Sequence, residues 1–100
     1  MSWQSVAKTA DVPVGGSHVI RVNGRELALF NLRGEVYCID NLCPHAMGPL
    51  ADGWIEGDIV ICPWHGWEFN IKTGDAAYGN EACVQTFPCR IDGDEILIDF

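Results

Sequence analysis

Two short motifs, each pairing a cysteine with a histidine, constrain this chain more than any other feature of its sequence. The first reads Cys-Pro-His at residues 43–45, and the second, after sixteen intervening residues, reads Cys-Pro-Trp-His at residues 62–65. A thiolate is a soft ligand suited to iron–sulfur clusters, zinc or Cu(I), and a neutral imidazole suits iron or zinc. The pattern therefore predicts a metal centre, before it indicates which metal, with four ligands: Cys43, His45, Cys62 and His65.

The order of the ligands narrows the choice of metal. Structural zinc sites usually group cysteine with cysteine and histidine with histidine, whereas each motif here holds one of each. If the two cysteines bind one iron and the two histidines another, each loop reaches across both irons of a two-iron cluster. A structural zinc module that serves as an interaction domain is the alternative from another class.

The motifs and their surroundings resemble the Rieske ferredoxins and Rieske domains. The resemblance rests on the two Cys–His motifs and on the residues around them: Gly48-Pro49-Leu50, Gly53, Gly66-Trp67-Glu68-Phe69 and Thr73-Gly74. It implies an all-β Rieske fold, in which an antiparallel β-sandwich basal domain carries an inserted cluster-binding subdomain of short strands and loops. It also implies one [2Fe–2S] cluster, with the inner iron on Cys43 and Cys62 and the outer iron on His45 and His65.

The same resemblance bears on the reduction potential. High-potential members of the family, found in respiratory complexes, have two further cysteines that form a disulfide between the ligand loops, and this chain has Gly48 and Trp64 there. Those members also place a serine and a tyrosine hydroxyl near the cluster, where this chain has Trp67 and Phe69. Because fewer hydrogen bonds to sulfur stabilise the reduced state less, we expect a low-potential cluster of the dioxygenase-ferredoxin type.

Local pattern predicts short β-strands throughout. Turn residues recur along the chain, and Asn23-Gly24 between two apolar runs is a strong hairpin signal. The expected strands cover residues 3–7, 18–22, 25–32, 35–40, 54–55, 59–61, 68–70, 84–91 and 95–100. We therefore expect one domain over residues 1–100, with a basal part at 1–40 and 82–100 and a cluster-binding subdomain at 41–81.

Charge and composition exclude several classes of protein. The net charge is −8, and residues 40–81 hold seven acids and one base, which argues against nucleic-acid binding. This acidity either attracts basic protein partners or serves solubility. The sequence has no apolar run of the ~18 residues that a membrane span needs, and no signal peptide is evident. Five cysteines do not resemble a secreted disulfide framework, so we expect a cytoplasmic protein. We also expect a monomer.

Several residues near the motifs carry their own expectations. Trp64, Trp67 and Phe69 are expected to shield the cluster from water, although ordinary core packing explains them equally well. Pro49 and Leu50 are expected to pack beside the outer histidine and to offer a partner an apolar contact. No metal role is expected for the remaining cysteines, of which Cys38 and Cys89 fall in predicted strands as small core residues, while the third is Cys83. His18 is expected on a strand at the surface.

The resemblance implies a soluble one-electron carrier rather than an enzyme acting alone. Such a carrier takes electrons from an NAD(P)H-dependent flavoprotein reductase and passes them to a terminal oxygenase. The alternative with a similar fold is the small subunit of an NAD(P)H-dependent nitrite reductase. The sequence identifies neither the partners nor the substrate pathway.

Overall fold

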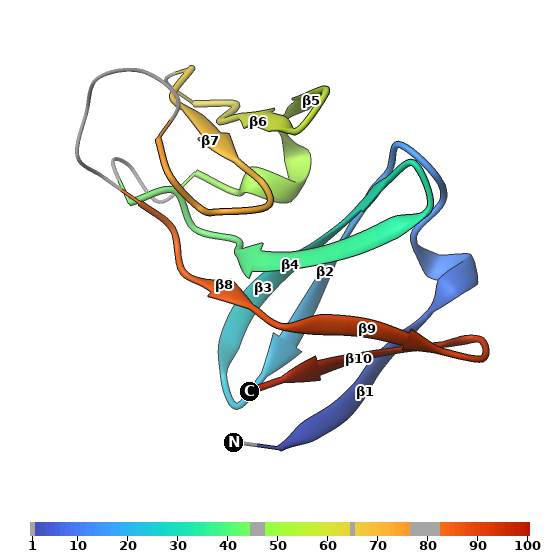
Figure 1. The fold of residues 1–100 in the computed structure, drawn as a ribbon. Coiled ribbons are helices and arrows are strands. Elements are labelled where there is room, and N and C mark those ends of the chain that lie inside the picture. Colours follow the sequence, from blue (N-terminus) through green and yellow to red (C-terminus); the bar gives the residue numbers. More distant parts are fainter. Residues whose placement is uncertain (1, 45–47, 65, 77–82) are drawn as a thin grey trace.

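The computed structural model describes residues 2–44, 48–64, 66–76 and 83–100 (Figure 1). Over these residues the chain is all-β, which confirms the predicted fold class, and its only helices are two 3-10 turns, Thr9–Asp11 and Leu50–Asp52. The strands are β1 (Trp3–Lys8), β2 (Ser17–Val22), β3 (Arg25–Leu32), β4 (Glu35–Asp40), β5 (Trp54–Glu56), β6 (Ile59–Ile61), β7 (Glu68–Asn70), β8 (Thr86–Phe87), β9 (Cys89–Asp92) and β10 (Glu95–Asp99). None of the described helices is long or apolar enough to cross a membrane.

The described strands form three antiparallel sheets, in the orders β1-β10-β9, β2-β3-β4-β8 and β5-β6-β7. The first two are the basal sheets, and we call the third the distal sheet. In Figure 1 the distal sheet lies on one side of β4, and the β9–β10 hairpin extends at the opposite end of the molecule.

The meander of β2, β3 and β4 forms as its turn residues predict. Asn23 and Gly24 have φ values of 51° and 82°, and Arg33 and Gly34 have 57° and 95°. Two consecutive residues at positive φ make a turn whose twist matches that of the flanking strands. The predicted strands at 25–32 and 35–40 are confirmed to the residue.

The prediction of one strand over residues 84–91 is wrong. β8 pairs with β4, whereas β9 pairs with β10 in the other basal sheet. Pro88 separates the two strands, because proline has no N–H to donate and a fixed φ. Its carbonyl still accepts a hydrogen bond of 3.0 Å from the backbone N–H of Asp99. The chain therefore crosses from one basal sheet to the other at this proline.

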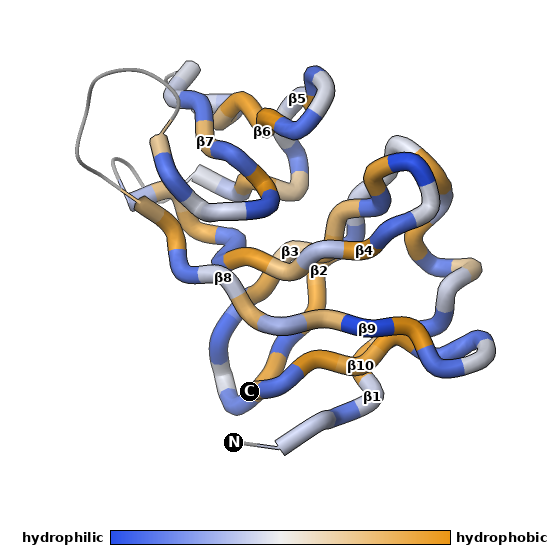
Figure 2. Tube along the Cα trace, viewed as in Figure 1, coloured by the Kyte–Doolittle hydropathy of each residue, from blue (hydrophilic) through white to orange (hydrophobic). Residues whose placement is uncertain are grey.

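β3 lies between two hydrophobic cores, because its side chains alternate between the two faces of the sheet. Leu27 and Leu29 join the core between the basal sheets, while Ala28 and Phe30 join the core beneath the distal sheet. The run of hydrophobic residues in β3, β4 and β10 is visible in Figure 2. The distal sheet is thus packed directly onto the basal fold rather than joined to it by a linker.

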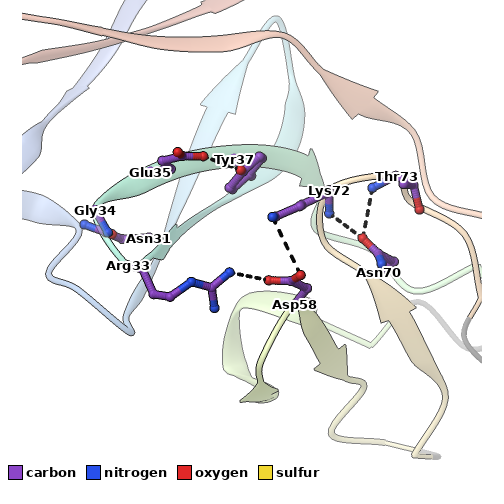
Figure 3. A network of polar contacts seen from close by, with 9 residues as sticks. All are labelled: Asn31, Arg33, Gly34, Glu35, Tyr37, Asp58, Asn70, Lys72 and Thr73. Carbon is purple, nitrogen blue, oxygen red and sulfur yellow. Dashed lines mark hydrogen bonds and ion pairs between the residues drawn. The ribbon is translucent and has the colours of Figure 1, made fainter.

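A polar network connects the β5–β6 turn of the distal sheet to the β3–β4 turn (Figure 3). Arg33 donates to Asp58 Oδ1 at 2.8 Å, and Lys72 Nζ lies 3.6 Å from Asp58 Oδ2. The hydrogen bond from Arg33 holds the pKa of Asp58 below its ordinary value. The backbone N–H of Ile71 also donates to the carbonyl of Asp58 at 2.8 Å. One carboxylate thus links the β5–β6 turn, the segment after β7 and the basal meander.

Candidate metal centre

Each predicted ligand motif lies in a loop closed by a backbone hydrogen bond. In the first, the N–H of Cys43 donates to the carbonyl of Gly48 at 2.9 Å. In the second, which joins β6 to β7, the N–H of Cys62 donates to the carbonyl of Trp67 at 2.7 Å, and Gly66 donates back to Cys62 at 3.0 Å. Both loops are therefore short and tightly constrained at their bases.

Gly48 brings the two loops together. A Cβ built on it would lie 2.9 Å from Cys62 Sγ and 3.0 Å from Cγ of Trp64. Separations this short leave no room for a side chain at position 48. The thiols of Cys43 and Cys62 are both buried. The structure therefore packs the first loop against one predicted ligand of the second.

His45 and His65 lie outside the described residues, so their placement is not part of the observed site. Each falls in sequence within one of the two closed loops. Among the described residues no group of three or more His, Cys, Asp or Glu side chains is arranged to hold a metal ion. The four-ligand set accordingly remains a prediction.

Asn41 fixes the base of the first loop, and sequence reasoning does not single it out. Its side chain is buried, and its Nδ2 donates to Glu26 Oε1 at 3.0 Å. Its Oδ1 accepts from the N–H of Ala51 at 2.8 Å, and its own carbonyl accepts from Leu50 at 2.7 Å. A buried amide with these partners ties the start and the end of the loop to β3. The sequence signal that could have identified Asn41 is its position between a predicted strand and the first cysteine of the motif.

The surroundings of the thiols are apolar, as expected of a shielded centre, but one of the sequence expectations is wrong. Leu50 is completely buried beside Cys43 and Cys62 in the distal core, so it cannot contact a partner. Phe69 is also buried there, and the Trp67 ring lies 6.4 Å from it. Trp64 packs against Gly48 and is 58% exposed, and its expected role in shielding the cluster stays a prediction. A loop has no regular alternation of inner and outer positions, so the direction of an aromatic side chain in it cannot be predicted from the sequence.

The remaining cysteines are not part of the two loops. Cys38 in β4 is buried in the basal core, and burial together with nearby Cys89 raises its pKa. Cys89 packs against the same core, and burial raises its pKa to about 11. Both are the small core residues that their strands predict. Cys83 is exposed, and His18 is partly exposed on β2.

The residues present fit a [2Fe–2S] cluster. Two buried thiols offer soft anionic donors from separate loops, each loop includes one histidine in sequence, and the missing Cβ of Gly48 lets the loops approach. Soft donors on two loops that approach each other this closely are consistent with a compact inorganic group.

Comparison with known proteins agrees with this chemistry. Residues 2–88 match the Rieske [2Fe-2S] domain. The ferredoxin component of the naphthalene 1,2-dioxygenase system from Pseudomonas aeruginosa is 35% identical over 98 residues, which cover 97% of this chain and 94% of that protein. The Sphingomonas yanoikuyae B1 ferredoxin superimposes with a TM-score of 0.89 at 34% identity, covering 99% of each chain.

Two further groups of solved structures share the fold. The complex of oxygenase and ferredoxin in carbazole 1,9a-dioxygenase matches with a TM-score of 0.87 at 26% identity, over 96% of this chain and 91% of that one. Chains named as nitrite reductase small subunits match at 19% and 20% identity, a level that shows the fold alone. From the matched residues and the level of identity, this chain belongs to the Rieske [2Fe-2S] domain family.

Proposed function

We propose that this chain is a one-electron carrier that holds a Rieske [2Fe–2S] cluster and passes electrons to a terminal oxygenase. The observation that carries the proposal is the meeting of the two closed loops, where Gly48 lies against the thiol of Cys62. Membership of the family and the similarity to ferredoxin components of dioxygenase systems support it. The chain is a component of such a system rather than a catalyst on its own.

Four residues would hold the cluster: Cys43 and Cys62 as thiolates and His45 and His65 as imidazoles. When bound, the cluster accepts and releases a single electron, and imidazoles in place of two thiolates make it easier to reduce. The protein contributes the buried thiols and the apolar wall of Leu50 and Phe69, which excludes water from their side of the site. The closed loop bases hold both cysteines in place through electron transfer.

The potential should lie toward the low end of the Rieske range. Position 48 has no room for a side chain, and Phe69 presents a ring without a hydroxyl in the buried core. Without an inter-loop disulfide or hydroxyl donors, the reduced state is less stabilised. We therefore propose a midpoint in the lower half of the roughly −150 to +300 mV range of such centres.

The partners follow from the same similarity. A relative of this fold, the carbazole 1,9a-dioxygenase ferredoxin, forms a complex with its oxygenase, and we propose an oxygenase as the electron acceptor here. We propose an NAD(P)H-dependent flavoprotein reductase as the donor. Cys38, Cys83 and Cys89 are thiols rather than disulfides, which suits a reducing compartment such as the cytoplasm.

The test is metal and sulfide analysis of protein isolated anaerobically, followed by redox titration. We expect two irons and two acid-labile sulfides per chain, and uptake of one electron. Cys43→Ser and Cys62→Ser should lose most of the iron, whereas the matched control Cys83→Ser, at an exposed cysteine, should retain it. One zinc per chain without sulfide would favour the structural zinc module instead.

A further inference from the structure

The outer face of the distal sheet exposes an aromatic side chain on its edge strand, β5. Trp54 pairs with Ile61, and Ile61 pairs with Glu68, so the three lie side by side across β5, β6 and β7. Directly paired residues in a sheet share a face, and the next residue along each strand points to the other face. Their neighbours Ile55, Val60 and Phe69 pack into the core on the inner face, so Trp54 points outward and is 62% exposed.

Carboxylates without side-chain partners lie on the same face as this aromatic side chain or near it in the sequence. Glu56 follows two residues later on the same strand face, and Asp52, the last residue of the 3-10 turn, lies two residues before Trp54 in the sequence. Within the described part of the chain, no side-chain hydrogen bond or ion pair involves Asp52, Glu56 or Glu68. Lys72, the only base between residues 40 and 81, is bound to Asp58. These carboxylates are consequently available to a cation from another molecule.

The apolar part of this face continues toward the metal loops. Ile61 ends β6, and Cys62 is the next residue along the chain. Trp64 in the same loop packs against Gly48 while 58% of its surface stays exposed. Trp54, opposite Ile61, lies at the end of the β5–β6 hairpin from which this loop departs. Exposed Trp54 and Trp64, with partly buried Ile61 between them in the sequence, therefore place apolar surface on the sheet face and in the loop that carries a predicted ligand.

We propose that this surface, the Trp54 face (Trp54, Ile61 and Trp64 with Asp52, Glu56 and Glu68), docks a protein redox partner. The partner's matching surface presents an apolar patch rimmed by lysine and arginine. This inference rests on the proposed function and extends it to a specific surface, which includes the side of the distal sheet as well as the ligand loop.

The chemistry of the face supports this occupant. Tryptophan is enriched among the few interface residues that contribute most to binding, and a ring of neighbouring groups keeps water from it. Carboxylates at the rim mainly raise the rate of encounter with a basic partner. A second copy of this chain fits poorly, because a two-fold contact would place like charges against each other.

The experiment uses oxidised horse-heart cytochrome c, a basic haem protein, as the probe partner. Reduced, cluster-loaded protein is mixed with it in a stopped-flow instrument, and the concentration dependence separates the apparent Kd from the limiting rate. We expect Trp54→Ser to raise the apparent Kd about tenfold with the limiting rate unchanged. The matched control is Trp3→Ser, which removes a tryptophan that is 40% exposed on the basal β1 and should change neither.

A second readout does not depend on electron transfer. In an NMR titration of ¹⁵N-labelled protein with cytochrome c, the indole N–H signal of Trp54 should shift several times more than that of Trp3. Equal shifts, or equal kinetics for Trp54→Ser and Trp3→Ser, would overturn the inference and confine docking to the ligand loops. A Trp54 signal that moves on dilution without cytochrome c would assign the face to self-association and also overturn it.

Failure of the proposed function has a different signature. It would appear as wild-type protein without iron and sulfide, or without uptake of an electron. The NMR comparison of Trp54 with Trp3 would still be measured on such protein, and it would decide the docking surface separately.

Discussion

The backbone of Gly48 lies directly against the thiol of Cys62. A Cβ at position 48 would stand 2.9 Å from Cys62 Sγ and 3.0 Å from Cγ of Trp64. A glycine in the first loop thereby decides how closely a predicted ligand of the second loop can approach. The conformation of Gly48 itself does not require glycine, because its φ is not positive, so the requirement comes from packing alone.

Gly48→Ala should therefore reduce the iron and sulfide content by more than half. The added methyl group must displace either Cys62 or the Trp64 ring, and both movements separate the loops. The matched control is Gly57→Ala, at a turn with φ of 60° and open space around the Cβ. It should lower stability by about 1 kcal/mol and keep the iron. Full iron in Gly48→Ala would show that the loops yield without loss of the site.

Electron transfer to a basic partner should slow several-fold as salt rises. The Debye length falls from about 8 Å at 0.15 M to about 3 Å at 1 M ionic strength, so exposed carboxylates attract less. Glu56→Lys or Glu68→Lys should weaken this salt dependence more than Asp94→Lys, which lies in the β9–β10 turn at the opposite end of the molecule (Figure 1). Stopped-flow rates across a salt series provide the measurement. Equal effects at both ends would mean that the acidity serves solubility.

Alkylation should modify one cysteine quickly. Cys83 is exposed, whereas Cys38 is buried. Burial raises the pKa of Cys89 to about 11, so only about 0.1% of that thiol is thiolate at pH 8. We expect iodoacetamide to add one group to the cluster-loaded protein, located by mass spectrometry at Cys83 and absent from Cys83→Ser. Rapid labelling of Cys38 or Cys89 would contradict the packing of the basal core.

Asp58→Asn should lower the Tm slightly at neutral pH, because it removes the carboxylate that links Arg33 and Lys72. The hydrogen bond from Arg33 lowers the pKa of Asp58 in the folded protein. Because the folded-state pKa is depressed, ionised Asp58 stabilises the fold at pH values above the ordinary pKa of 3.8. This stabilisation is lost as the pH falls through the folded-state pKa. The difference in Tm between wild type and variant should thus be present at pH 7 and shrink below about pH 4.

Much of the fold could be predicted from local sequence. Asn23-Gly24 and Arg33-Gly34 locate two turns, and the strands between and after them match prediction to the residue. The spacing of the two Cys–His motifs predicts a metal centre, and the family that matches residues 2–88 bears out the type of cluster. These signals are strong because they depend on neighbouring residues: a turn needs positive φ, and a metal ligand needs a particular side chain.

Only the tertiary structure decided how distant segments meet. The crossing at Pro88, the pairing of β1 with β10 and the contact of Gly48 with Cys62 each join residues that are far apart in the chain or in different loops. The direction of side chains in irregular segments is equally non-local. Leu50 turned out to be buried and Trp64 exposed, although both are apolar residues close to the ligands. In a strand, alternation tells inside from outside, but in a loop only the packing of the neighbouring segments does.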